Sequence, residues 1–391
     1  MEATSLAATA FLSGEELLLR ETVRRFLKDT VVPLVPKMEA EGRPPAGLLK
    51  SMGDLGLLGT FLPEEYGGAG GSLMTRAIVS EETARVNVGL DTTIFVNVTL
   101  VARHLANYGT REQKQKYLVP LIRGDVSASI CITEPTGGSD ALSPRTIARR
   151  DGDYWVVKGH KTLITNSPIA EFFLVFARTS GEDRRAQGGT CFIVDKDAPG
   201  LSVGKPFNKL SMRSSPTAEV YFDDVRVHRS GVLGEVDRGF FIMLDGLDIE
   251  RAFVGAIGTG IGQACLDIVV PYAAGRVVFG KPIAQYQMIQ DKIAKMSTGV
   301  EVARTMFYNL MRACERGETV TREAAMMKLY TTEMAVAASR DAVQILGGYG
   351  LMEEYQVARL YRDAKHHEIG AGTNEIQKII ISRETLKAYG L

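Results

Sequence analysis

The sequence predicts a multidomain α+β protein in which a helical block, a β block and a second helical block follow one another. Helical periodicity dominates residues 13–124, and alternating runs with turn signals fill residues 126–235 before helical periodicity returns. The length of 391 residues also favours two or three packed units over one domain. We therefore expect an N-terminal helical domain over residues 1–125, a central β-barrel or sandwich domain over 126–236, and a C-terminal helical domain over 237–391.

The N-terminal block opens on a helix-start signal. Ser13 followed by Glu16 is a capping box, and apolar residues then recur at helical spacing. The glycine-rich stretch 62–72 lacks the preceding strand and the Lys-Ser/Thr ending of a phosphate-binding loop, so we interpret it as a connector. Further helices are expected over residues 48–58, 74–86, 93–108 and 111–123.

The central block carries the signals of short strands. Turn residues such as Asp151-Gly152 separate runs rich in β-branched and aromatic residues. The expected strands cover residues 126–132, 154–158, 172–177, 190–194 and 219–227.

The C-terminal block contains four closely spaced glycines, from Gly255 to Gly262, that imitate a dinucleotide-binding motif. No strand precedes them and no ribose-binding acid follows at the required distance, so a Rossmann site is excluded. We expect instead the tightly packed face of a helix.

Composition excludes several functional classes. Lys+Arg and Asp+Glu both number 46, so the net charge of zero argues against a nucleic-acid-binding surface. No run of about 18 apolar residues is apparent, and we expect no membrane span. The start lacks the features of a secretory signal. The four cysteines are widely spaced, and adjacent helical residues such as His366 and His367 point about 100° apart, so no metal site is expected.

Residues 130–140 are the most informative stretch. An apolar run breaks at Glu134-Pro135 and opens into a turn of small polar residues that includes Gly138 and Ser139. Glycines allow a ligand to approach the backbone closely, and the hydroxyls of Thr133 and Ser139 add hydrogen-bonding groups. This exposed backbone suits a flat ligand that makes hydrogen bonds.

Three stretches, taken together, carry a family resemblance. Residues 131–134 with 137–140 (CITE…GGSD), residues 344–350 (QILGGYG) with Glu354, Arg359 and Asp363 downstream, and residues 276–281 (RVVFGK) with Gln287 each resemble a motif of the acyl-CoA dehydrogenases. The resemblance runs from Leu17 to about Leu386. The chain is therefore similar to that family over nearly its whole length.

The resemblance implies a fold of helical, β and four-helix-bundle domains, with FAD between the β domain and the C-terminal helices. It also implies a homotetramer, a dimer of dimers, in which a neighbouring subunit supplies part of each FAD site. Thr165 would lie near flavin N5. The cofactor-binding residues that the resemblance implies are Ile130, Cys131, Ile132, Thr133, Gly138, Ser139, Leu163, Thr165, Arg276, Phe279, Gln287, Gln344, Gly347, Gly348, Thr373, Asn374 and Glu375.

The chemistry of the family needs a carboxylate base to remove the weakly acidic α-hydrogen of an acyl thioester. Most relatives carry this base just before the Gly-Thr of the last motif, where this chain has Ala371. Glu250 matches the alternative position of the isovaleryl-CoA and long-chain branch, so we assign it as the catalytic base. Asp91 is a weaker candidate, since a few ring-oxidising relatives use an acid in that region.

The resemblance also implies where substrate would bind. Asp248 and Arg251 would lie near the CoA moiety, Ser139 would lie close to the CoA side, and the N–H of Ala371 would stabilise the thioester oxyanion. Small Gly370 and Ala371, followed by Gly372, indicate space for a branched, cyclic or aromatic acyl group. Leu163 and Val278 stand where many relatives have tryptophan and threonine.

The leading interpretation is thus FAD-dependent α,β-dehydrogenation of an acyl-CoA to the trans-2-enoyl-CoA, with electrons passed to an electron-transfer flavoprotein. A flavin monooxygenase on the same fold and a non-catalytic family member remain alternatives. An acyl-CoA oxidase ranks below both, because such enzymes are usually much longer proteins. The expected location is cytoplasmic in a bacterium and the mitochondrial matrix in a eukaryote.

Overall fold

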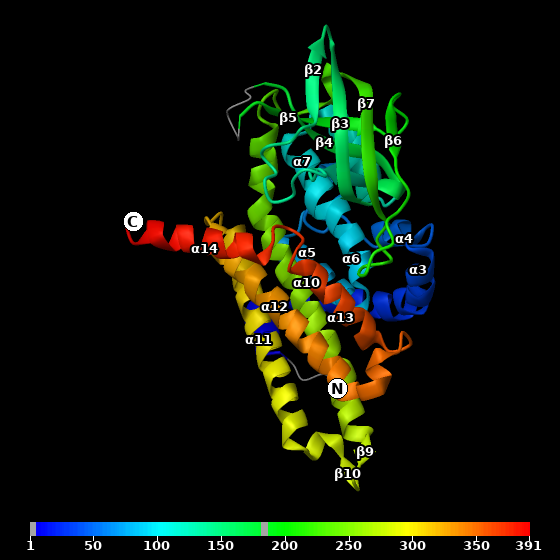
Figure 1. Cartoon of the computed structure of the whole chain (residues 1–391), viewed down its shortest axis with the longest axis vertical. Coiled ribbons are helices and arrows are strands. Elements are labelled where there is room, and N and C mark those ends of the chain that lie inside the picture. Colours follow the sequence, from blue (N-terminus) through cyan, green and yellow to red (C-terminus); the bar gives the residue numbers. More distant parts are fainter. Residues whose placement is uncertain (1–4, 181–186) are drawn as a thin grey trace.

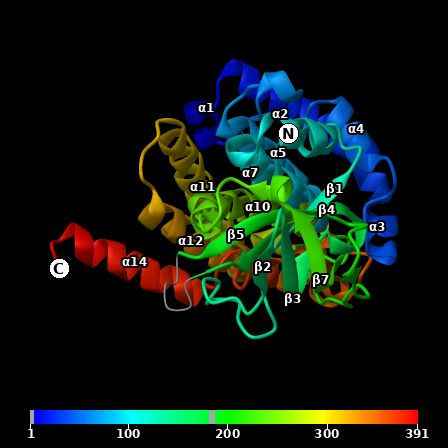
Figure 2. The same ribbon diagram turned by 90° about the horizontal axis from the view of Figure 1, so that it is seen from above.

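The computed structural model describes residues 5–180 and 187–391, and its elements follow the predicted order of helices, sheet and helices (Figure 1). The sheet lies at one end of the long axis and the C-terminal helices extend toward the other end. Seen from above in Figure 2, helix α10 (Gly239–Gly275) passes between the N-terminal helices and the remaining C-terminal helices.

The N-terminal helices begin where side chains cap them. The Ser13 hydroxyl accepts from Glu16 N and the Glu16 carboxylate accepts from Ser13 N, which confirms the capping box. Helix α6 begins at Val88 because Asn87 Oδ1 accepts from Leu90 N at 2.7 Å, so the predicted start at residue 93 was wrong. The helices are α1 (Leu6–Phe11), α2 (Gly14–Phe26), α3 (Val35–Glu41), α4 (Leu48–Asp54), α5 (Leu73–Val86), α6 (Val88–Ile94), α7 (Arg103–Tyr108), α8 (Arg111–Gln113) and α9 (Val119–Ile122).

Several of these helices are joined by wider turns. The π-helical segment Leu27–Val31 continues α2. A second such segment, Phe95–Ala102, joins α6 to α7, and a third, Lys114–Leu118, joins α8 to α9. Residues 88–108 therefore form one long, mostly buried rod. The stretch 62–72 is a connector with one short turn, as expected.

The central block forms one sheet whose described strands run in the order β6-β7-β3-β2-β4-β5-β8, with β1 paired parallel to β4. The expected strands are all present, and the longest extend several residues beyond their predicted ends. The strand at Ile147–Asp151 was not predicted, because its Ala-Arg-Arg-Asp sequence has little preference for β structure. The strands are β1 (Ser127–Cys131), β2 (Ile147–Asp151), β3 (Tyr154–Thr165), β4 (Ala170–Arg178), β5 (Gly189–Asp195), β6 (Leu201–Val203), β7 (Thr217–His228) and β8 (Val232–Leu233).

The C-terminal helices pack around α10. Helices α11 and α12 lie beside it, and α13 and α14 pack against α12. A two-stranded hairpin, β9 and β10, follows α10 at the far end of the long axis (Figure 1). The remaining bounds are β9 (Val277–Val278), β10 (Lys281–Pro282), α11 (Gln287–Glu315), α12 (Thr321–Leu346), α13 (Gln356–His367) and α14 (Asn374–Ala388).

Helix α10 corrects the expectation that no segment is apolar enough to span a membrane. By length and composition alone, α10 is long and apolar enough to span a membrane, with a mean hydropathy of 1.6 over its most apolar 18 residues. The value is high because this stretch contains many aliphatic residues and few charges. However, 72% of that stretch is buried inside the protein, as in the core helix of a packed bundle.

The glycines of α10 are packing positions, as predicted. A Cβ at Gly258 would lie 2.8 Å from the carbonyl oxygen of Thr331 on α12, and one at Gly260 would lie 2.4 Å from that of Glu81 on α5. These neighbours are backbone atoms that cannot move aside. The glycines therefore let three helices approach closely.

We expect Gly260→Ala to lower the free energy of unfolding by about 1–3 kcal/mol or more, because overpacking displaces backbone. The matched control is Gly275→Ala in the same helix, where a Cβ meets no atom within 4 Å. That variant should be neutral or slightly stabilised. Chemical denaturation of both variants measures the difference, and equal stabilities would show that α5 does not press on α10.

Candidate active site

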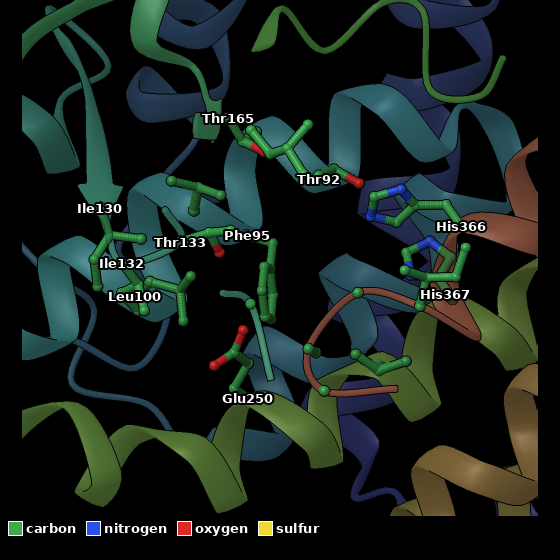
Figure 3. Close-up of a pocket in the computed structure, with 18 of the residues that line it drawn as sticks. Thr92, Phe95, Leu100, Ile130, Ile132, Thr133, Thr165, Glu250, His366 and His367 are labelled. Carbon is green, nitrogen blue, oxygen red and sulfur yellow. The ribbon is translucent and has the colours of Figure 1, made fainter. Parts of the chain in front are cut away.

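A cavity of about 370 Å³ lies where the three blocks meet (Figure 3). Its walls come from the ends of β1 and β3, the rod that starts at α6, the first half of α10, and the segment from α13 to α14. The lining residues are Thr92, Phe95, Val96, Leu100, Ile130, Ile132, Thr133, Gly138, Ser139, Leu163, Ile164, Thr165, Glu250, Val254, Ile257, His366, His367, Ile369, Gly370, Ala371, Gly372 and Thr373.

The turn after β1 is held by a buried ion pair. The Glu134 carboxylate accepts from Lys161 Nζ at 2.8 Å and from the backbone N–H of Thr146 at 3.0 Å, while Lys161 also donates to Ile132 O. Although burial raises it, the Lys161 ammonium and the hydrogen bonds hold the pKa of Glu134 below its usual value. The pair fixes the backbone from Ile132 onward and so presents the following turn to the cavity.

This wall offers unengaged polar groups to a ligand. Thr133, Ser139 and Thr165 line the cavity, and their hydroxyls bond to no other side chain or backbone group in the described parts of the chain. Leu163 has a φ of +57° and its side chain is 61% exposed, so a bulky apolar residue is held facing the cavity. Cys131 is buried in the core of the sheet, which leaves only its backbone for a ligand.

The opposite wall contains a loop held in an unusual backbone conformation. Ala371 has a φ of +55° and Gly372 a φ of +82°, and Thr373 then caps α14 by accepting from Ile376 N. The Asn374 side chain turns inward, where its Oδ1 accepts from Lys328 Nζ at 2.9 Å. This buried bond anchors the loop to α12. Glu375 is exposed on the first turn of α14.

Glu250 is the carboxylate that faces the cavity (Figure 3). Within the described residues, no hydrogen bond or ion pair engages its carboxylate. Burial raises the pKa of Glu250 to about 7, and the charge of the neighbouring Arg251 opposes this rise. Arg251 instead donates to Asp248 Oδ1 at 2.8 Å. An unpaired carboxylate with a pKa near neutrality has the properties of a general base.

The other carboxylates considered from the sequence do not face the cavity. Asp91 is fully buried and accepts from Ser80 at 2.8 Å and from Arg76 at 3.4 Å. Glu368, which follows the last residue of α13, pairs with Lys365 and does not line the cavity. Asp248 accepts from Thr321 as well as from Arg251, and neither member of that pair lines the cavity.

A second group of sequence-predicted residues gathers at the far end of the bundle. Arg276, Gly347 and Gly348 line a surface pocket of about 440 Å³, and Gln287 and Gln344 are exposed there or nearby. Phe279 occupies the tip of the β9–β10 hairpin, where its side chain is 94% exposed. Figure 1 shows this hairpin far from the sheet, so these residues do not join the cavity of their own chain.

Sequence reasoning missed part of the wall. Phe95, Val96 and His367 line the cavity, although none was predicted to do so. A signal for His367 was present, because it continues the buried face of α13 from Leu360 and Ala364 at helical spacing. Nothing in the sequence alone distinguishes the cavity-lining residues of the α6 rod from its other buried residues.

Comparison with known proteins identifies the family. Residues 13–125 match the acyl-CoA dehydrogenase N-terminal domain, residues 129–225 the middle domain, and residues 237–386 the C-terminal domain. The chain belongs to the acyl-CoA dehydrogenase family. The resemblance read from the three motifs is confirmed, and so are the fold class and the membership of a family of oxidoreductases that act on CH–CH bonds.

Relatives match along nearly the full chain. The 3-(aryl)acrylate reductase of Clostridium sporogenes is 37% identical over 96% of this chain and 100% of its own. The mitochondrial isovaleryl-CoA dehydrogenase of Solanum tuberosum is 38% identical over 94% of this chain and 90% of its own. A glutaryl-CoA dehydrogenase of Mycobacterium smegmatis, solved with FADH2, is 29% identical and superposes with a TM-score of 0.92 over 96% of both chains.

Acyl-CoA dehydrogenases depend on FAD, which confirms the predicted cofactor. The residues of this chain fit it: three unengaged hydroxyls and an exposed leucine face the cavity, and a Cβ at Gly138 would meet only the Thr133 methyl, at 3.8 Å. Thr133, Ser139 and Thr165 would hold the flavin ring.

Proposed function

We propose that the protein dehydrogenates an acyl-CoA at the α and β carbons, with Glu250 as the base. The observation that carries this proposal is the unpaired Glu250 carboxylate in the cavity whose opposite wall fits a flavin. FAD, when bound, accepts the hydride from the β carbon. Glu250 takes the α-proton, and its raised pKa favours the protonated form of the Glu250 carboxyl group that results.

The loop at Ala371 supplies the complementary charge stabilisation. As the α-proton leaves, negative charge develops on the thioester oxygen, and backbone N–H groups in a water-poor cavity stabilise such charge strongly. The positive φ of Ala371 and Gly372 sets the direction of the peptide groups in this segment. The role needs no side chain, so alanine in place of the usual glutamate is compatible with it.

The substrate we infer is a short acyl group of branched, cyclic or aromatic shape. Phe95, Leu100 and Val254 give the cavity an apolar wall beside Glu250. The space over Gly370 is partly taken by the protein itself, since a Cβ there would lie 2.8 Å from His366 Nε2. The names of the Clostridium and Solanum relatives point to the same range of acyl groups.

Glu250 gives the reaction a predicted pH dependence. Because only the carboxylate form accepts a proton, kcat/KM should fall about tenfold per pH unit below the pKa of about 7 and level off above it. Initial rates with an artificial electron acceptor between about pH 5 and 9 measure this profile. A profile that is flat through neutrality would assign the base to a different group.

We further propose a homotetramer that passes electrons to an electron-transfer flavoprotein, since both are typical of the family. The exposed Phe279 and the pocket at Arg276 and Gly348 support a site completed by a second copy. Homologues occur in bacteria and in mitochondria, so we infer a cytoplasmic or mitochondrial-matrix location. Analytical ultracentrifugation of the flavin-containing protein tests the assembly, and a monomer that keeps its flavin would contradict it.

A further inference from the structure

His367 presents a buried polar atom that the chain does not satisfy. It is the last residue of α13, its side chain lines the cavity, and its Nε2 is buried without a hydrogen-bond partner among the described residues. Burial lowers the pKa of His367 well below its ordinary value, so the ring is neutral. A buried nitrogen left in this state destabilises the protein unless a ligand bonds to it.

His366 places a second imidazole beside the first. The two ring centroids lie 5.2 Å apart with the planes at 80°, and the His366 ring also lines the cavity. Burial lowers the pKa of His366 to about 4, with Lys209 and Lys328 adding to the effect. No hydrogen bond to the His366 ring is formed within the described parts of the chain. The pair is therefore neutral and offers both donor and acceptor nitrogens.

Nearby polar groups are engaged elsewhere and do not satisfy these rings. Lys209 donates to Ser215 O and to Thr217 Oγ1, and Lys328 donates to Asn374 Oδ1. In Figure 3 both rings lie on the side of the cavity away from Glu250. A ligand group that reaches them is therefore remote from the carbon that loses its proton.

We propose that His366 and His367 determine substrate specificity by hydrogen-bonding a hydroxyl group on the distal end of the acyl chain. The inference rests on the proposed function. It adds that the preferred substrate is not a plain hydrocarbon acyl group but one that carries a hydroxyl, such as a hydroxyaryl group, away from the thioester.

The chemistry of the pair selects a hydroxyl over other distal groups. A hydroxyl both donates and accepts, which matches a neutral imidazole pair. A carboxylate would be buried against uncharged rings, and the ammonium groups of Lys209 and Lys328 are already engaged with Ser215, Thr217 and Asn374. A hydrocarbon of the same shape would leave His367 Nε2 unsatisfied, and sites built to bond a hydroxyl discriminate strongly against the analogue that lacks it.

The test measures binding without turnover. The Glu250→Gln holoprotein is titrated anaerobically with 3-phenylpropanoyl-CoA and with 3-(4-hydroxyphenyl)propanoyl-CoA, and the change in the visible flavin spectrum gives each dissociation constant. The same pair is measured after adding His367→Phe, which keeps a flat ring, and His367→Gln, which keeps a hydrogen-bonding group. Flavin content is recorded for every variant.

We expect the hydroxylated ester to bind about tenfold or more tightly than the plain one, as a buried hydrogen bond predicts. The preference should vanish in His367→Phe and return in part in His367→Gln. Equal binding of the two esters would overturn the inference, as would a preference that persists unchanged in flavin-containing His367→Phe. Loss of flavin from His367→Phe but not from His367→Gln would also overturn it, because the ring would then serve the cofactor. If neither ester perturbs the flavin of Glu250→Gln or bleaches the parent protein, the proposed function itself fails.

Discussion

Replacement of Glu250 by glutamine should abolish dehydrogenation while leaving a folded, flavin-containing protein. Removal of a positioned base lowers rates by about 10²–10⁴-fold or more. The amide occupies the same volume, and Glu250 makes no hydrogen bond or ion pair within the described residues that the change would break. Anaerobic stopped-flow reduction of the flavin by an acyl-CoA measures the loss.

The matched control for this variant is Glu368→Gln. Glu368 lies three residues before Ala371 in the sequence, but it pairs with Lys365 and does not line the cavity. Its rate should stay within a few-fold of the parent rate. If Glu250→Gln reduces its flavin as fast as the parent, the base assignment is wrong, and Asp91 becomes the next candidate despite its buried pairing with Arg76.

The second large effect is expected at Gly138. A side chain there meets only the Thr133 methyl within the chain itself, at 3.8 Å, and the backbone has no left-handed conformation to strain. The position nevertheless lines the cavity, so Gly138→Val should leave the fold intact and push the flavin out. We expect FAD affinity to fall by more than about tenfold, as for a lost close contact of a few kcal/mol.

Gly137→Val serves as the comparison, because a Cβ there also meets nothing closer than 3.8 Å and the residue does not line the cavity. The ratio of protein to flavin absorbance after gel filtration compares the two variants. Circular dichroism establishes that both are folded. Full flavin content in Gly138→Val would place the cofactor away from the turn that follows β1.

The sequence predicted the architecture well where local signals agreed with burial. The capping box at Ser13, the strand runs of the central block and the packed glycines of α10 all appear as expected. Strand β2 was missed because two adjacent arginines hide it, and its place is set by pairing with β3. The apolar character of α10 was underestimated because its glycines interrupt the run of aliphatic residues.

The candidate site was predictable in part. The motif residues Thr133, Thr165, Glu250 and Ala371 do meet in one cavity, although they lie far apart in the sequence. By contrast, the sequence indicates no role for His367 once a metal site is excluded, and Phe95 lies in a rod that is buried almost throughout. Which face of a buried helix borders a cavity depends on tertiary packing, which no single-sequence pattern contains.

Anaerobic addition of a branched or aromatic acyl-CoA to the purified flavoprotein is the most direct test of the central claim. We expect the visible flavin absorbance to bleach, with one trans-2-enoyl-CoA formed for each flavin reduced, and Glu250→Gln to stay yellow. A flavin that no acyl-CoA bleaches, or a reduced flavin that reacts rapidly with oxygen to hydroxylate an amine, would contradict it and favour a non-catalytic family member or a monooxygenase.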